Sequence, residues 1–168
     1  LSEYLNKKPE NLTACILERS RHNKIITELR DLKVKIKFIS DGDISGALLV
    51  SDEKYSVDIF LGTGGGPEGV LSAAALDAFN CSFQGRFLFQ TDEDKQRAKQ
   101  MGIRDFNKKY ELNEIIKGDS IFCATGITTG DLISGIKIDE DKFISETLVT
   151  HKHSCLKKVV KLNQKIIR

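Results

Sequence analysis

The sequence predicts an α/β protein, a layered sandwich with a mixed, mostly parallel sheet and helices on both faces. Short apolar runs of strand length alternate with helical patterns through the first three quarters of the chain, which is typical of parallel sheets covered by helices. The last quarter adds period-2 segments that indicate antiparallel strands. The 168 residues carry no visible repeat or linker, so we expect a single α/β domain over 1–168.

The first half of the chain predicts three strands and a helix. The runs 12–17 and 57–61 are apolar, and the run 34–38 alternates apolar residues with lysines. The apolar positions between the first two strands recur at helical spacing after Ser20, which is a plausible N-cap. These positions are Ile25, Ile26, Leu29 and Leu32.

The second half of the chain alternates in the same way before it turns to antiparallel strands. The predicted elements are a helix over 70–79, a strand over 86–89, helices over 92–101 and 112–116, a buried strand over 120–124, and strands over 136–138, 143–151 and 155–162.

Composition excludes several classes of protein. A net charge of +2 without a concentrated basic face gives no reason to expect nucleic acid. No stretch approaches the ~20 apolar residues of a membrane span, and no signal-peptide pattern opens the chain. The chain begins with Leu1, so we expect that residue 1 is not the start of the gene product. We expect a cytoplasmic protein.

The four cysteines do not form a CxxC pair. Cys15, Cys81 and Cys123 fall in apolar contexts, and we interpret them as small buried hydrophobes in a reducing compartment. A disulfide framework is not expected from this spacing.

Polar or glycine-rich segments directly follow four of the predicted strands. They are Arg19-Ser20-Arg21, Asp41-Gly42-Asp43, Gly62 to Glu68, and Thr125-Gly126. In open α/β sheets, ligands bind outside the carboxyl ends of the parallel strands. If the four strands are parallel neighbours, all four segments share one rim, and we expect a single site there.

The glycine-rich segment from Gly62 to Gly69 is the strongest element of this site. Consecutive glycines permit positive φ and close approach of a ligand, and Pro67 suits the first helical position. The free amides and the helix dipole then face an anion. The alternatives are a tight turn without a ligand and the GxGxxG pattern of dinucleotide-binding proteins. The carboxylate of Glu68 opposes a pyrophosphate, but it suits a divalent cation such as Mg²⁺ or Mn²⁺ between it and a phosphate.

The other segments carry charges that suit a phosphorylated sugar. Asp41 and Asp43 could face one pocket and bind sugar hydroxyls or a metal, although Asp-Gly turns are also common without a ligand. Arg19 and Arg21 at a helix start could hold a phosphate through the guanidinium fork, or could be solvated surface residues.

Two further features stay open in the sequence. His151, His153 and Cys155 alternate and could form a soft-metal site. No fourth ligand is evident, so we favour the alternative that these residues bind no metal. The segment from Gly126 to Gly135 could close over phosphate through Thr128, Thr129 or its amides, and Asp131 could equally be a helix cap.

Several stretches of the chain together resemble the bacterial class II fructose-1,6-bisphosphatases, relatives of the lithium-sensitive sugar phosphatases. The stretches are LTACILERSRH, ISDGDISGALL, VDIFLGTGGGPEGVLSAAAL, KQMGI, IFCATGITTGDLISGI and ISETLVT. They cover nearly the whole chain in the order of the family. The glycine motif with PEG and the ATGIT-GDL motif are highly specific together.

The resemblance implies hydrolysis of the 1-phosphate of fructose 1,6-bisphosphate with Mn²⁺ or Mg²⁺, in gluconeogenesis or the Calvin cycle. Sedoheptulose 1,7-bisphosphate is implied as a substrate in some lineages. Matched by position, Glu68 corresponds to a metal ligand of the family. The implied substrate-binding residues are Arg19, Ser20, Arg21, Asp41, Gly42, Asp43 and Gly65. The resemblance does not assign a catalytic residue.

Family members are about twice this long, and their N-terminal half carries the other acidic metal ligands. We therefore expect this chain to be the C-terminal half of the phosphatase fold and incomplete for catalysis. We expect a homo-oligomer, a dimer or tetramer, formed through the full-length chain. The alternative function is a non-catalytic α/β module that binds a nucleotide or a sugar phosphate.

Overall fold

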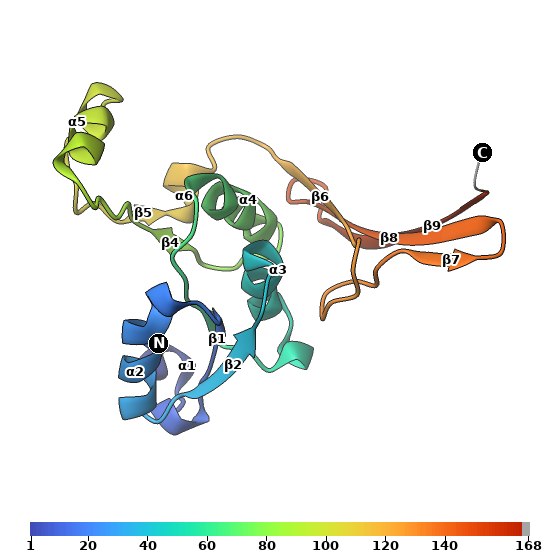
Figure 1. Ribbon diagram of the computed structural model, residues 1–168, viewed down its shortest axis with the longest axis horizontal. Helices are drawn as coiled ribbons and strands as arrows, with labels where there is room; N and C mark the ends of the chain where they lie inside the picture. The colour runs from blue at the N-terminus through green and yellow to red at the C-terminus, as the bar shows by residue number, and fades with distance from the viewer. Residues whose placement is uncertain (166–168) are drawn as a thin grey trace.

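The structure, a computed structural model, describes residues 1–165 and confirms the α/β class (Figure 1). The helices are α1 (Ser2–Leu5), α2 (Asn23–Asp31), α3 (Asp43–Leu48), α4 (Gly66–Asp77), α5 (Asp92–Gln100) and α6 (Leu112–Ile115). The strands are β1 (Thr13–Leu17), β2 (Lys35–Ile39), β3 (Ile59–Phe60), β4 (Gln84–Gly85), β5 (Tyr110–Glu111), β6 (Ile121–Thr125), β7 (Lys137–Asp139), β8 (Lys142–His151) and β9 (Leu156–Lys165). Short 3₁₀ turns are η1 (Pro9–Asn11), η2 (Ser20–His22), η3 (Leu49–Ser51) and η4 (Glu53–Tyr55).

A three-stranded parallel sheet, in the order β2-β1-β3, positions the segments that carry the predicted site. β1 is the central strand, and its residues from Ala14 to Leu17 are buried, as the apolar run predicts. β1 and β2 pair in register from Thr13 opposite Lys35 to Leu17 opposite Ile39, so the two strands end side by side. The segments that follow them therefore leave the sheet at the same edge.

Helices lie on both faces of this parallel sheet, as the sequence predicts (Figure 1). Two adjacent residues of β2 show the two faces, because successive side chains of a strand point to opposite sides. Phe38 lines a pocket together with Ile26 of α2, and Ile39 packs against α3, where a methyl group built on Gly46 would collide with it. The glycine lets α3 lie directly on the sheet.

The layer formed by α3 and α4 has the antiparallel strands on its other side, which gives the layered sandwich (Figure 1). Its core is a cluster of six buried side chains: Ala47 and Leu48 of α3, Ala75 and Leu76 of α4, Phe122 of β6 and Leu148 of β8. The helices thus bury apolar side chains against both sheets.

The antiparallel strands β6, β7, β8 and β9 form a four-stranded sheet of their own and do not extend the parallel one, and β4 pairs antiparallel with β5 in a separate two-stranded sheet. β8 is the centre of the four-stranded sheet, with β6 and β7 beside it and β9 paired along its whole length. All ten residues of β9 are exposed, and the β8–β9 hairpin extends away from the body of the molecule (Figure 1). The sequence predicts that these strands join the parallel sheet and make it mixed. In the structure they form a separate sheet, which corrects this detail of the prediction.

Four local predictions also differ from the structure. Residues 86–89 are not a strand; the aromatic rings of Phe87 and Phe89 instead pack with Tyr110 and Phe106. The strand predicted over 57–61 is shortened to Ile59–Phe60. Ser20 opens η2 and does not cap α2, whose first residue is Asn23. Cys123 is exposed, because β6 turns that side chain away from the helices.

None of the helices within residues 1–165 is long and apolar enough to cross a bilayer.

Asp58 fixes the start of β3 against the N-terminal segment and gives a prediction on stability. Its carboxylate accepts hydrogen bonds from Lys7 Nζ at 2.6 Å and from the Thr13 N–H at 2.8 Å. Burial alone would raise the pKa of Asp58, but these hydrogen bonds and the charges of Lys7 and Lys35 outweigh it and lower the pKa below 3.8. A carboxyl with a lowered folded-state pKa stabilises the protein at neutral pH, and this stabilisation is lost as the pH falls through that pKa.

We expect Asp58→Asn to lower the free energy of unfolding by about 1.5 kcal/mol at neutral pH, because charge-assisted hydrogen bonds are lost. The difference from the wild type should begin to shrink below about pH 5, as the unfolded carboxyl becomes protonated, and should continue to shrink as the pH falls through the lowered folded-state pKa. Urea denaturation across this range measures it, with the exposed Glu10→Gln as the control. A deficit of the same size at every pH would contradict the assignment.

Candidate functional site

Three of the four predicted segments meet at one rim of the parallel sheet. They follow β1, β2 and β3, which run in the same direction and pair as neighbours. Arg21 Nε donates a hydrogen bond to the Thr63 carbonyl oxygen at 2.6 Å, and Arg19 Nη2 lies 3.9 Å from Asp41 Oδ1. The first segment therefore contacts both of the others.

The fourth segment, Thr125-Gly126, does not share this rim, and that expectation was wrong. It follows β6, which pairs antiparallel with β8 in the other sheet. An apolar strand followed by a glycine has the same pattern in both kinds of sheet, so the sequence could not separate them.

The segment from Gly126 to Gly135 folds into a compact loop that contacts the parallel sheet from the side. The Glu146 carboxylate accepts a hydrogen bond from the Ser134 N–H at 2.9 Å, which lowers the pKa of Glu146. Thr129 Oγ1 accepts from the Gly135 N–H at 3.0 Å, and Asp131 pairs with Lys37 of β2 at 2.5 Å. Asp131 thus links the loop to the sheet and is not a helix cap.

The glycine-rich segment connects β3 to α4, whose N-cap is Gly65. Its glycines provide space rather than unusual dihedral angles, since positive φ among the glycines of residues 1–165 occurs at Gly42 and Gly102 alone. A methyl group built on Gly65 would collide with the Glu68 carboxylate, and one built on Gly64 would lie 3.6 Å from Asp43 Oδ2. Two carboxylates therefore lie close against this backbone.

The Asp41-Gly42-Asp43 segment directs its two carboxylates differently. Gly42 has φ 87°, a left-handed conformation that favours glycine, and precedes α3, which begins at Asp43. Asp43 is half-buried beside Gly64, whereas the side chain of Asp41 is 94% exposed and its nearest cation is Arg19. Asp43 is therefore the better placed of the two toward the glycine-rich segment.

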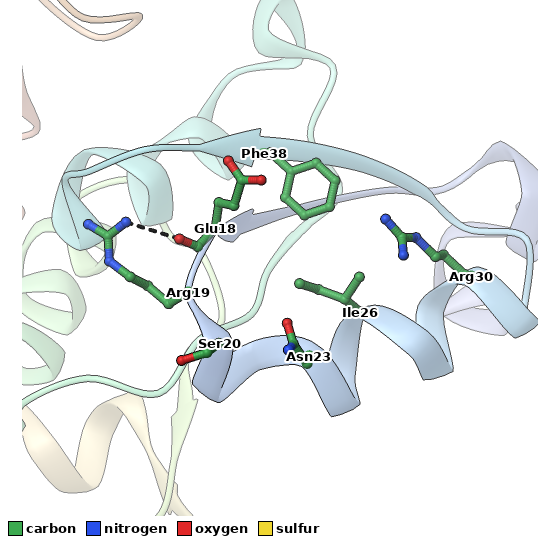
Figure 2. Close-up of a pocket in the computed structure, with 7 residues that line it drawn as sticks. All are labelled: Glu18, Arg19, Ser20, Asn23, Ile26, Arg30 and Phe38. Carbon is green, nitrogen blue, oxygen red and sulfur yellow. Dashed lines mark hydrogen bonds between the residues drawn. The ribbon is translucent and has the colours of Figure 1, made fainter.

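The Arg19-Ser20-Arg21 segment also divides between two surroundings. Arg19 and Ser20 line a pocket of about 320 Å³ beside α2, whose other lining residues are Glu18, Asn23, Ile26, Arg30 and Phe38 (Figure 2). In this view Arg19 and Arg30 lie at opposite ends of the pocket, with the Phe38 ring between them. Arg21 is not part of this lining and reaches Thr63 instead.

His22 is a residue of this rim that the sequence analysis did not select. It is fully buried, and both ring nitrogens have partners: Nδ1 lies 2.8 Å from the Leu17 carbonyl oxygen, and the Thr63 N–H donates to Nε2 at 2.9 Å. The sequence offers one signal for His22, which is its position directly after Arg21 in a segment of the predicted rim. The burial of His22 could not be predicted from a single sequence.

Glu68 is available as a metal ligand. Its side chain is exposed in the first turn of α4, and within residues 1–165 neither a salt bridge nor a hydrogen bond engages its carboxylate. No group of three His, Cys, Asp or Glu side chains that could hold a metal occurs in this part of the chain. A single hard oxygen ligand fits a divalent cation only if the other ligands come from elsewhere.

The structure explains why the soft-metal alternative does not arise. Residues 152–155 form a turn, so His153 and Cys155 do not continue the alternation of β8. His151 is hydrogen-bonded to Ser154 Oγ and to Asp119 Oδ2, both at 2.7 Å. Burial raises the pKa of the Cys15 thiol to about 11, which makes it a poor nucleophile at neutral pH.

Comparison with known proteins places the chain in a family. Residues 1–164 match the family described as bacterial fructose-1,6-bisphosphatase, glpX-encoded. Three curated relatives are each named D-fructose 1,6-bisphosphatase class 2/sedoheptulose 1,7-bisphosphatase. The protein of Synechococcus sp. (strain JA-3-3Ab) is 34% identical over 92% of this chain and 48% of its own length. The protein of Trichodesmium erythraeum (strain IMS101) is 31% identical over the same shares.

The third relative, from Prochlorococcus marinus (strain MIT 9515), is 36% identical over 89% of this chain and 49% of its own length. The chain therefore spans about half the length of the curated relatives it matches. The match over residues 1–164 includes every segment of the rim. The chain belongs to the glpX-encoded family of bacterial fructose-1,6-bisphosphatases.

Proposed function

We propose that this chain is the C-terminal, substrate-binding half of a metal-dependent phosphatase that hydrolyses the 1-phosphate of fructose 1,6-bisphosphate. The observation that carries the proposal is the meeting of Arg21, Asp43 and Glu68 around one glycine-rich segment. Membership of the family supports the reaction, and the names of the relatives support sedoheptulose 1,7-bisphosphate as a second substrate.

The residues of the rim suit the parts of a sugar bisphosphate. Arg21 uses Nε to hold Thr63, which leaves its terminal nitrogens free to donate to a phosphate. Arg19 and Ser20 extend this grip along the neighbouring pocket. Asp43 accepts hydrogen bonds from sugar hydroxyls beside the glycine-rich segment, and Asp41 and Gly42 bind the substrate from the exposed side of the turn. Gly65 is proposed to contact the substrate at the start of α4, next to the Glu68 carboxylate.

Glu68 is the residue of this chain that would hold the metal, for which Mn²⁺ and Mg²⁺ are the candidates because both prefer oxygen ligands. When bound, the metal supplies an activated water and neutralises charge on the leaving phosphate. The remaining ligands are proposed to lie in the half that the longer relatives possess. The chain itself binds and orients the substrate.

The wider setting is part of the same proposal. Residues 1–168 would form one α/β domain of a cytoplasmic homo-oligomer, a dimer or tetramer, that acts in gluconeogenesis or the Calvin cycle. Neither nucleic acid nor a membrane would be a partner. The near-balanced charge supports the absence of a nucleic-acid surface.

Phosphate release by the complete protein tests the proposal. We expect release from fructose 1,6-bisphosphate with Mn²⁺ or Mg²⁺ and loss of activity with a chelator, while fructose 6-phosphate is not hydrolysed. Binding of sugar bisphosphates without turnover under any metal would favour the alternative, a non-catalytic module for a nucleotide or sugar phosphate.

Asp43→Ala gives a narrower test of the rim. Because Asp43 lies beside Gly64 and Asp41 is exposed, we expect Asp43→Ala to lower kcat/KM by about tenfold or more and Asp41→Ala to lower it less. Both variants should keep the thermal stability of the wild type to within a few degrees. The exposed Asp139→Ala on β7 is the matched control. Full activity of Asp43→Ala would mean that Asp43 only forms the turn.

A further inference from the structure

His22 joins the end of β1 to the glycine-rich segment through both of its ring nitrogens. Nδ1 lies 2.8 Å from the carbonyl oxygen of Leu17, the last residue of β1, and Nε2 lies 2.9 Å from the backbone nitrogen of Thr63. The ring is completely buried, so water cannot replace either partner.

The chemistry of these partners determines the tautomer of the ring. A carbonyl oxygen can only accept a hydrogen bond, so Nδ1 must carry the proton that it donates to Leu17. A backbone N–H can only donate, so Nε2 must be unprotonated to accept from Thr63. The Thr63 carbonyl oxygen lies 3.3 Å from Nε2, but in this tautomer both atoms are acceptors and no hydrogen bond joins them. His22 is therefore neutral, with its proton on Nδ1.

Two residues of the same turn fix the path of the glycine-rich segment. His22 holds the peptide group before Thr63 through its N–H, and Arg21 holds the peptide group after Thr63 through its carbonyl oxygen at 2.6 Å. Glycines surround these two peptide groups, at Gly62 and Gly64, and restrict the backbone very little on their own. The anchored stretch is followed by Gly65 and the helix that presents Glu68.

We propose that His22, in its neutral Nδ1–H tautomer, is a positioning residue that sets the glycine-rich segment and, through it, the placement of substrate against Asp43 and Glu68. The catalytic part of this inference rests on the proposed phosphatase function. The structural part, that Nε2 of His22 anchors the Thr63 amide, can be measured without any turnover.

Two substitutions separate the two ring nitrogens. An asparagine amide occupies the place of Nδ1, so His22→Asn keeps a donor for Leu17 and removes the acceptor for Thr63. A glutamine amide reaches the place of Nε2, so His22→Gln provides an oxygen for the Thr63 N–H and gives up the donor to Leu17. Each variant loses one hydrogen bond at the same buried position, which makes them matched controls for each other.

The measurements on the complete protein are amide hydrogen exchange at Thr63 and the kinetics of phosphate release. In His22→Asn we expect the Thr63 amide to exchange about tenfold or more faster than in the wild type, beyond any change that global unfolding explains. We also expect kcat/KM to fall about tenfold. In His22→Gln both quantities should stay within about threefold of the wild type. Equal exchange at Thr63 in the two variants, or equal loss of activity in both, would overturn the proposal.

The wild type alone supplies a further measurement if a variant does not fold. A long-range ¹H–¹⁵N spectrum of the ¹⁵N-histidine-labelled protein should show a protonated Nδ1 and an unprotonated Nε2 for His22; the opposite tautomer would overturn the inference. A wild-type protein that releases no phosphate from sugar bisphosphates would refute the proposed function instead, while the exchange comparison would still decide the role of His22.

Discussion

Replacing Glu68 with glutamine should abolish most of the phosphatase activity of the complete enzyme. The amide keeps the shape of the side chain but loses the negative charge that strengthens the binding of a divalent cation. Metal ions contribute several kcal/mol to such reactions, so we expect kcat/KM to fall by at least about a hundredfold. Because no salt bridge within residues 1–165 depends on Glu68, the melting temperature without metal should barely change.

The control for this substitution is Glu93→Gln, an exposed glutamate in the first turn of α5. It should leave both activity and melting temperature unchanged. The isolated 168-residue chain should bind Mn²⁺ only weakly by calorimetry and should release no phosphate, since its described residues do not bring three metal-binding side chains together. Metal-dependent turnover by the isolated chain would contradict the proposal that the site is completed from the other half.

Arg21→Ala should raise the KM for fructose 1,6-bisphosphate by roughly ten- to a hundredfold, because a charge-assisted contact of about 1.5–3 kcal/mol to phosphate is lost. The structure adds a second reason, since Arg21 Nε also holds the Thr63 carbonyl oxygen. Arg21→Lys keeps the charge but cannot make both contacts with the fork of a guanidinium, so it should recover only part of the loss.

Steady-state kinetics over a range of substrate concentrations measure the effect, with the exposed Arg104→Ala as the control. An unchanged KM in Arg21→Ala would remove Arg21 from the substrate site. A drop in kcat alone would indicate that the bond to Thr63 is its only role.

The parts of the fold that could be predicted are those that local patterns determine. The buried run of β1, the polar helix α5 and the long strand β8 each appear where the sequence indicates them. Which strands share a sheet depends on partners far along the chain, and for that reason β6 was assigned to the wrong sheet. Residues 86–89 have the aromatic composition of a strand, but their rings pack into a side-chain cluster instead.

The candidate site was predictable to a similar degree. A glycine-rich segment after a strand identifies the rim, whereas the role of Glu68 as a ligand of a cation stays a prediction. The function of the glycines could not be read correctly, because room for a neighbouring carboxylate and a positive φ produce the same residue in the sequence. Gly65 illustrates the first case and Gly42 the second. Burial of His22 arises from tertiary packing, which a residue-by-residue pattern does not contain.

The long exposed strand β9 has a consequence for the solubility of this chain. An outer strand presents unpaired backbone N–H and C=O groups to which a strand of another molecule can add, and such addition initiates aggregation. β9 carries Val159, Val160 and Leu162 among its exposed residues, a composition that favours this process. Four lysines, Lys157, Lys158, Lys161 and Lys165, interrupt the apolar residues, and their mutual repulsion opposes the stacking of identical strands.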